Sequence, residues 1–261
     1  MRGLLLLLPI AAMTTGCGGG ESAEKPQWAD SVAVYQEEVA QTEPGPERAY
    51  AQLRYAVALM ETGKLEAAEK QLTAAKKALG RAAAWHLQRG NLYYLQQDTL
   101  KAREAYAAAV EADPDLAEAH LLLGSLSYEL GDTAQALTAF NRAIELNEEA
   151  FLPRYYRALL QKDRGYYDQA LQDFNRALEL RPQFAPAYLN RGLVHQAMHS
   201  KRAALNDFDK ALALQDSFSA AQAARGRFYL SINQPERACP DLQAAHRAGQ
   251  PVPDSLLKAC K

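Results

Sequence analysis

Few side chains in this 261-residue chain have the type and spacing that chemistry requires. His195 and His199 are four residues apart, so they would share one face of a helix and could bridge a metal ion. The helical zinc motif HExxH also needs an acidic residue between its histidines, and none stands there. We therefore predict no metal site.

Other common catalytic patterns are missing as well. The sequence contains neither the phosphate-binding pattern GxxxxGK[ST] nor the serine turn GxSxG. Its aspartates and glutamates are numerous, but they are spread along polar helix faces rather than gathered. We expect no enzyme activity, no cofactor and no small-molecule substrate.

The first of the three cysteines follows a hydrophobic leader. Arg2, the apolar run 4–13 and the small residues before Cys17 are typical of a secretory signal, and the run is too short to span a membrane. Residues 15–17 (Thr-Gly-Cys) resemble the cleavage box of bacterial lipoproteins, although Thr14 replaces the usual leucine. We predict a signal peptide over 1–16 and lipidation of Cys17. The alternative is an ordinary signal peptide with a chance cysteine.

Residues 17–48 would connect this anchor to the rest of the protein. The glycine-rich stretch 18–22 predicts a flexible tether. Gly18, rather than aspartate, follows Cys17; by resemblance to proteobacterial sorting rules this favours the outer membrane, with the exposed side left open. The pattern of residues 28–41 predicts a short amphipathic helix, which either caps the first following unit or lies in a groove.

Every other candidate residue must be positioned by helices, because small residues recur every 34 positions. The three series are Ala56, Gly90, Gly124, Ala158, Gly192, Gly226; Ala68, Ala102, Ala136, Ala170, Ala204, Ala238; and Ala75, Ala109, Ala143, Ala177, Ala211, Ala245. Residues 117–150 show the repeated unit: an amphipathic helix, a Gly131-Asp132 turn and a second, antiparallel helix. The small residues allow the helices to approach closely, and a large residue such as Phe140 or Phe174 fills the space between them.

These residues resemble the tetratricopeptide repeat (TPR), a helix-turn-helix unit with small packing sites, an aromatic residue in the second helix and a proline near its end. The match comprises six units within 49–252: 49–82, 83–116, 117–150, 151–184, 185–218 and 219–252. The family's early tryptophan is absent, and four units lack the proline. The resemblance implies an all-α, right-handed superhelical solenoid, with residues 253–261 as a C-terminal capping helix.

Two features of the repeat concern pairing. Arg157, Arg191 and Arg225 each precede an aspartate by sixteen residues, at Asp173, Asp207 and Asp241. We interpret them as Arg–Asp pairs within single units; the alternative is a row of arginines that binds an anion. Cys239 lies in the last second helix, and Cys260 lies 34 residues after Gly226, so we predict a disulfide that pins the capping helix. Two buried free thiols are the alternative.

The charge balance bears on the partner. A formal charge of −2, with both signs interleaved along the helices, argues against nucleic acid. In TPR proteins the first helices line a concave groove, and here its stripe is mostly apolar and aromatic, as at a binding surface. The predicted groove residues are Leu87, Asn91, Tyr94, Leu121, Ser125, Tyr128, Tyr155, Leu159, Lys162, Gln196 and Arg227, with Leu53, Val57, Met60, Leu189, Leu193, Ala223 and Leu230 on the same stripe.

The Lys and Asn clamp with which some family members hold a peptide carboxylate is not expected, since only Asn91 matches clearly. The leucines of the stripe either contact a partner or fill the space between helices; for the tyrosines we favour partner contact. The sequence predicts a lipid-anchored scaffold or adaptor of the bacterial envelope that binds a protein or peptide segment. The alternative is a structural subunit of an envelope secretion, assembly or motility complex.

Overall fold

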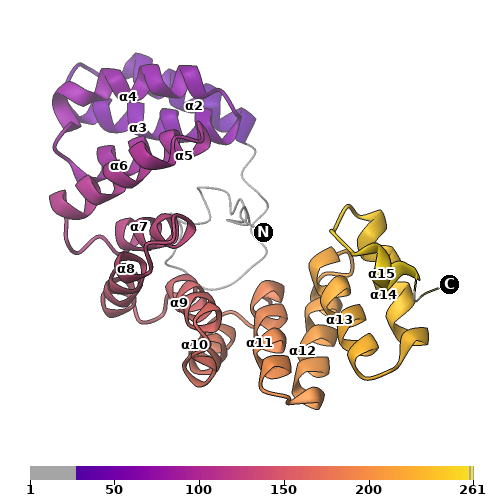
Figure 1. Cartoon of the computed structure of the whole chain (residues 1–261). Coiled ribbons are helices and arrows are strands. Elements are labelled where there is room, and N and C mark those ends of the chain that lie inside the picture. Colours follow the sequence, from indigo (N-terminus) through magenta and orange to yellow (C-terminus); the bar gives the residue numbers. More distant parts are fainter. Residues whose placement is uncertain (1–27, 259, 261) are drawn as a thin grey trace. The chain divides into compact units, whose positions relative to one another are not determined.

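The computed structural model describes residues 28–258 and 260, and every regular element among them is a helix. The helices are α2 (Trp28–Gln41), α3 (Pro46–Glu61), α4 (Leu65–Leu79), α5 (Ala83–Leu95), α6 (Thr99–Ala112), α7 (Ala117–Glu129), α8 (Thr133–Leu146), α9 (Phe151–Asp163), α10 (Tyr167–Leu180), α11 (Ala185–Ala197), α12 (Lys201–Leu214), α13 (Ser219–Ser231), α14 (Pro235–Arg247) and α15 (Asp254–Lys258). The helix pairs from α3 to α14 are the six predicted units (Figure 1). The predicted all-α fold of paired helices is confirmed.

The chain divides into two compact bodies, Met1–Glu148 and Glu149–Lys261. The first body holds the pairs α3/α4, α5/α6 and α7/α8, and the second holds α9/α10, α11/α12 and α13/α14. Within each body, a second helix packs on its own first helix and on the first helix of the next pair. First helices also touch each other, as α3 touches α5 and α11 touches α13. In each body, we call the surface of these first helices the first-helix face.

The small residues are required where the two helices of a pair cross. A Cβ atom on Gly124 would lie 2.8 Å from the ring of Phe140, and one on Gly192 would lie 2.8 Å from the ring of Phe208. Both rings are fully buried, so they could not move aside without disturbing the core. The predicted close approach therefore explains these glycines.

The turn between the paired helices also repeats every 34 residues. One residue in each turn has a positive φ: Gly63, Gln97, Gly131, Gly165, His199 and Asn233. Glycine adopts this left-handed conformation without strain, whereas other residues do so at a cost. His199 thus lies in the turn after α11, so it does not share a helix face with His195.

The three Arg–Asp pairs form as predicted. The Nε and Nη2 atoms of Arg191 donate to the two carboxylate oxygens of Asp207 at 2.9 and 2.7 Å, and Arg225 binds Asp241 in the same way at 2.7 and 2.9 Å. Nη1 of Arg191 also reaches back to Asn175 in the preceding second helix, at 2.8 Å. Each of these two arginines, Arg225 by way of Asp209, therefore joins its own unit to the one before it.

Helix α2 packs against α3 at the start of the first body. Val32 contacts the core of the first pair, Glu38 forms an ion pair with Arg54, and Gln36 accepts a hydrogen bond from Tyr55. Tyr55 stands 34 residues before Arg89 in the repeat and occupies the position from which Arg191 reaches back to a preceding second helix. These contacts fit a capping role for α2, in the place of a second helix from a preceding unit.

The other end of the chain is held by α15 and a disulfide. Val252, Leu256 and Leu257 pack on the hydrophobic cluster of α13 and α14. Cys239 and Cys260 form a disulfide, with 5.2 Å between their Cα atoms. Within 28–258, no helix is both long and apolar enough to cross a membrane.

Candidate functional site

The predicted groove stripe has three rows, one residue per unit in each, and the structure treats the rows differently. The first row is buried in every unit: Leu53, Leu87, Leu121, Tyr155, Leu189 and Ala223. Burial therefore favours the space-filling alternative for Leu87 and Leu121, and it places Tyr155 in the core rather than at the expected partner contact. The leucines are wedged between neighbouring helices, and the ring of Tyr155 lies 5.0 Å from that of Phe184 and 6.0 Å from that of Phe174.

The second and third rows contain the accessible part of the face. Partly exposed residues there are Val57, Leu159, Leu193 and Arg227 in the second row and Tyr94, Tyr128, Lys162, Gln196 and Leu230 in the third. Asn91, Ser125 and Met60 are buried. We predicted Asn91 and Ser125 as groove residues, and their side chains are not accessible to a partner. The face that remains is largely apolar and aromatic, with single polar groups.

Polar side chains of α5 and α6 meet at the first-helix face of the first body. The hydroxyl of Tyr106 donates to Oδ1 of Asn91 at 2.8 Å, and Nδ2 of Asn91 donates to Gln88 at 3.0 Å. Tyr106 stands where other units have phenylalanine or leucine, so only this unit sends a hydroxyl from the helix crossing toward the face. Burial raises the pKa of Tyr106.

Two carboxylates at opposite ends of α7 act electrostatically on the buried Tyr106 hydroxyl. The hydroxyl of Tyr94 donates to Glu129; burial and the negative charge of Glu129 raise the pKa of Tyr94 to about 12. Burial also raises the pKa of Glu129. Glu118, in the first turn of α7, has its pKa raised by burial to about 7, and its Oε1 atom is buried with no hydrogen-bond partner. We call Asn91, Tyr94, Tyr106, Glu118 and Glu129 the acidic cluster.

Sequence reasoning missed Glu118 and Glu129 in this cluster. Each is one of many glutamates, and its burial depends on the packing of α7 against α5 and α6, which the repeat pattern does not specify. The available signal was Tyr106, the hydroxyl-bearing exception in a series of phenylalanines and leucines.

The cations predicted for the groove lie in the second body and have partners. Nζ of Lys162 donates to Oδ1 of Asn190 at 2.9 Å, and Nη2 of Arg227 donates to the carbonyl oxygen of Pro251 at 3.0 Å. Lys162, Arg227 and Gln196 stay partly exposed on their helices. The two cations are thus fixed in direction, although they are not enclosed.

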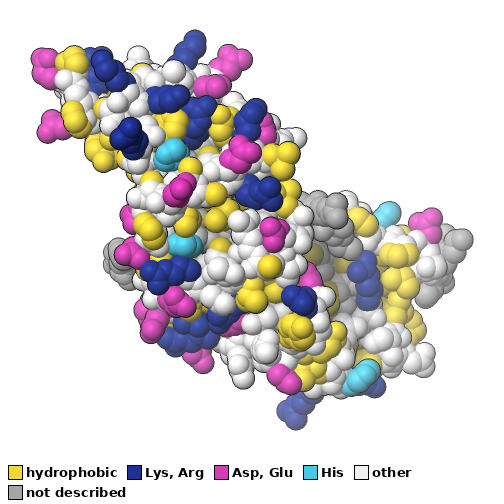
Figure 2. Space-filling view, turned by 60° about the vertical axis from the view of Figure 1, so that its left-hand side comes forward, with side chains coloured by type: hydrophobic (Ala, Val, Ile, Leu, Met, Phe, Trp, Pro, Cys, Tyr) yellow, Lys and Arg dark blue, Asp and Glu magenta, His cyan; other side chains and the backbone are white. Residues whose placement is uncertain are grey.

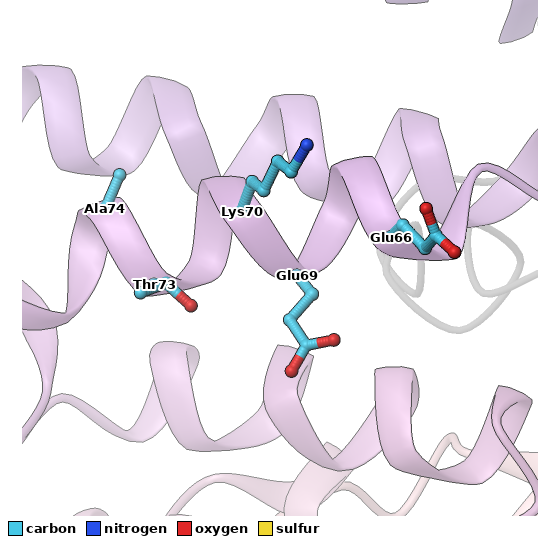
Figure 3. Close-up of a pocket in the computed structure, with 5 residues that line it drawn as sticks. All are labelled: Glu66, Glu69, Lys70, Thr73 and Ala74. Atoms are coloured by element: carbon cyan, nitrogen blue, oxygen red, sulfur yellow. The ribbon is translucent and has the colours of Figure 1, made fainter.

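The remaining candidates for chemistry are structural. His195 lies 3.8 Å from Asp207, and burial lowers its pKa. Among residues 28–258, no group of three or more His, Cys, Asp or Glu side chains is placed to hold a metal ion. A shallow surface depression is lined by Glu66, Glu69, Lys70, Thr73 and Ala74, all from α4 (Figure 3). It is open to solvent and draws on a single helix, so it provides no enclosed site.

The surface charges are mixed. Figure 2 shows Lys and Arg side chains interspersed with Asp and Glu side chains over the face in view, with hydrophobic side chains between them. Cys17, the predicted lipidation site, lies outside the described residues.

Solved structures with the same fold were found by comparison. A chain of the APC/C hetero-tetramer Cut9–Hcn1 superposes with a TM-score of 0.76 at 16% identity, over 89% of this chain and 46% of that one, so this chain spans less than half its length. A TPR protein from Parabacteroides merdae gives 0.65 at 23% identity, over 89% and 92%. YrrB, described as a TPR protein with an unusual peptide-binding site, gives 0.58 at 24%, over 74% and 98%.

These similarities show the fold. No curated protein sequence matches the chain significantly. Two family models do match it: Tetratricopeptide repeat over residues 26–84 and 87–151, and TPR repeat over 162–198. Together they cover more than half of the sequence, and they fall on the repeated helices described above. The chain therefore belongs to the tetratricopeptide repeat family.

Proposed function

We propose that this protein is a non-catalytic scaffold or adaptor that binds a protein or peptide segment through its first-helix face. The observation that carries the proposal is the partly exposed apolar and aromatic surface of that face, formed by residues such as Tyr94, Leu159, Leu193 and Leu230. Apolar side chains that are partly exposed at a surface favour binding of a partner, because the contact removes them from water.

Relatives of similar fold support the same kind of function. TPR units serve as protein-interaction scaffolds, and YrrB is described as having a peptide-binding site.

The place of action is the second part of the proposal. A lipid on Cys17 would anchor the protein in the bacterial envelope, at the outer membrane, with the glycine-rich stretch 18–22 as a flexible tether. The support is the sequence of the leader and of residues 15–17. Cells grown with labelled palmitate test it: the wild type takes up label and stays with membranes, whereas Cys17→Ser does neither. A labelled, membrane-bound Cys17→Ser variant contradicts the proposed anchor.

The binding face is tested by charge placed on it. Leu159→Asp combined with Leu193→Asp puts two carboxylates on the apolar surface, so we expect partners recovered by crosslinking in intact cells to disappear. Lys70→Asp with Lys210→Asp is the matched control, because both lysines are exposed on second helices. If the Leu159→Asp, Leu193→Asp variant keeps its circular dichroism spectrum and still recovers as much partner as the wild type, the first-helix face is not the binding surface. A captured complex that survives detergent and high salt favours the structural-subunit alternative.

A further inference from the structure

Exposed large hydrophobic side chains gather at the turns within the helix pairs. Among the described residues, four of the six most exposed ones lie in or next to such a turn: Leu100, Leu130, Tyr166 and Met198. The first body has two of these four. Leu100, near the start of α6, is 60% exposed, and Leu130, directly after α7, is 39% exposed. They occupy neighbouring turns of that body.

Packing within the first body does not explain these two leucines. Neither belongs to the hydrophobic cluster formed by α5, α6 and α7. At the place of Leu100, other units have the charged residues Glu66, Asp168, Arg202 and Glu236. At the place of Leu130, other units have Thr62, Gln96 and Arg164. The fold therefore accepts polar residues at both positions, and the leucines are removed from water only by contact with something outside the described residues.

The three turns within helix pairs of the first body lie at one edge. Consecutive helices from α3 to α8 are joined by short loops and pack on each other, so they alternate in direction. Gln96, directly after α5, donates a hydrogen bond to Glu69 near the start of α4 at 3.5 Å, which brings the α5–α6 turn beside the α3–α4 turn. We call residues 62–64, 96–101 and 130–132 the turn edge.

The chain also enters the first body at the turn edge. Only residues 42–45 separate α2 from α3, and Gln36 accepts a hydrogen bond from Tyr55, so the two helices are antiparallel. Eight residues before Gln36 is Trp28, where α2 begins, and eight residues after Tyr55 is Gly63, in the α3–α4 turn. Because both helices rise equally per residue, α2 begins level with the turn edge.

We infer that the turn edge of the first body rests on the lipid bilayer, with the side chains of Leu100 and Leu130 inserted among the lipid headgroups. This inference rests on the proposed lipid anchor at Cys17, and it adds which side of the body meets the membrane. The chain between Cys17 and α2 spans at most ~35 Å when fully extended, and it joins the body at the turn edge. Such a tether keeps this edge near the bilayer, where a weak apolar contact is enough to hold it.

The charges of the turn edge suit a contact that does not depend on anionic lipid. Lys64 and Lys101 are balanced by Asp98 and Asp132. Lys101 pairs with Asp98 at 2.6 Å, and the carboxylate of Asp132 accepts the backbone N–H of Gln135 at 3.1 Å. Since these charges cancel, the contact comes from the leucines and should persist at high salt.

Fluorescence quenching on the full chain tests the contact. The protein is purified from membranes with its lipid and reconstituted into vesicles of phosphatidylethanolamine and phosphatidylglycerol that contain a nitroxide-labelled lipid. Lys64→Cys provides a thiol in the turn edge for an NBD fluorophore, while Cys239 and Cys260 are held in their disulfide. We expect the nitroxide to quench this fluorophore at low and at high salt. A fluorophore on Tyr50→Cys, about 20 Å away along α3, should stay unquenched.

The leucines are tested with the fluorophore kept at Lys64→Cys. Leu100→Asp with Leu130→Asp should abolish most of the quenching, because two carboxylates do not enter the headgroup region as leucines do. Val34→Asp is the matched control, since Val34 is 62% exposed on α2 of the same body but lies outside the turn edge, and it should leave the quenching unchanged. The circular dichroism spectrum of each variant must match that of the wild type, so that lost quenching does not come from unfolding.

The outcomes separate this inference from the proposed anchor, because palmitate labelling of Cys17 is read independently. If Cys17 is labelled but the fluorophore at Lys64→Cys is not quenched, or is quenched equally in the Leu100→Asp, Leu130→Asp variant, the inference is overturned and the anchor stands. Benzoylphenylalanine at Leu100 that crosslinks in intact cells to a protein rather than to lipid also overturns it. If Cys17 takes up no label, the proposed anchor fails and the inference fails with it.

Discussion

Glu118 shows at the scale of one residue how packing can oppose ionisation. In the unfolded chain its carboxyl group has an ordinary pKa, whereas in the folded protein burial raises that pKa to about 7. Below both values the group is neutral in both states and costs nothing. As the pH rises from about 4.5 to 7, the unfolded state loses its proton first, so ionisation favours unfolding.

We therefore predict that Glu118→Gln stabilises the protein above pH 7 and has little effect near pH 4.5. The gain at pH 8 is up to ~3 kcal/mol, the free-energy equivalent of the pKa shift. Urea unfolding of both proteins at pH 5 and pH 8 measures it. If the variant and the wild type differ in free energy of unfolding by the same amount at both pH values, burial does not raise the pKa of Glu118.

Residues on the stripe show where prediction from sequence stops. Helical spacing alone places Leu87 and Tyr94 on one face of α5, and Tyr155 on the equivalent face of α9. Which of them are wedged between helices depends on the angle at which neighbouring first helices meet, and a spacing rule carries no such angle. Tyr94 stays accessible, whereas Leu87 and Tyr155 become part of the core.

At the scale of the element, the turn within each helix pair shows the free-energy cost of a left-handed backbone conformation without side-chain clashes. Gly165 and His199 occupy equivalent turns with φ of 77° and 58°, and nothing lies within 4 Å of a Cβ atom built on Gly165. Side-chain clashes are therefore absent, and only the left-handed conformation matters.

We predict that His199→Gly stabilises the protein by about 1 kcal/mol and that Gly165→His destabilises it by a similar amount. Thermal unfolding of the two variants and of the double swap measures both effects. If His199→Gly lowers the melting temperature, the imidazole has a role that the turn geometry does not account for.

The Arg–Asp pairs belong to the same scale, because each links two helices of one unit. Arg191→Met would leave Asp207 buried without its two charged hydrogen bonds, so we expect a loss of about 3 kcal/mol. Arg191→Met with Asp207→Leu removes the orphaned charge as well and should recover most of that loss. Chemical denaturation of the three proteins gives the coupling; a double variant as unstable as the single one would contradict it.

The repeat period predicts these elements well. Six helix pairs, the small residues at their crossings and the Arg–Asp pairs all follow from residues that recur every 34 positions. The acidic cluster does not, because it depends on exceptions to the period: Tyr106 stands in place of phenylalanine or leucine, and Glu118 has no glutamate at the equivalent position of any other unit.

At the scale of the whole molecule, the units within each body contact the units next to them, so we expect stability to be local. The disulfide between Cys239 and Cys260 closes a loop of 21 residues at one end of the second body. Its loss should cost about 3 kcal/mol there.

We therefore predict that Cys239→Ser with Cys260→Ser lowers amide hydrogen-exchange protection in α13, α14 and α15 but leaves α3 to α6 unchanged. Exchange followed by mass spectrometry resolves the two regions. A uniform loss of protection over both bodies would show that the chain unfolds as one cooperative block, against the nearest-neighbour account.

The central claim is that the first-helix face binds a protein segment, and photo-crosslinking tests it most directly. Benzoylphenylalanine placed at Leu193 or Leu230 on that face, or at Lys70 or Lys210 on second helices, is activated by light in intact cells. The account predicts a discrete crosslinked species from the first two positions and none from the others. Crosslinks from the second helices alone, with none from Leu193 or Leu230, would contradict it.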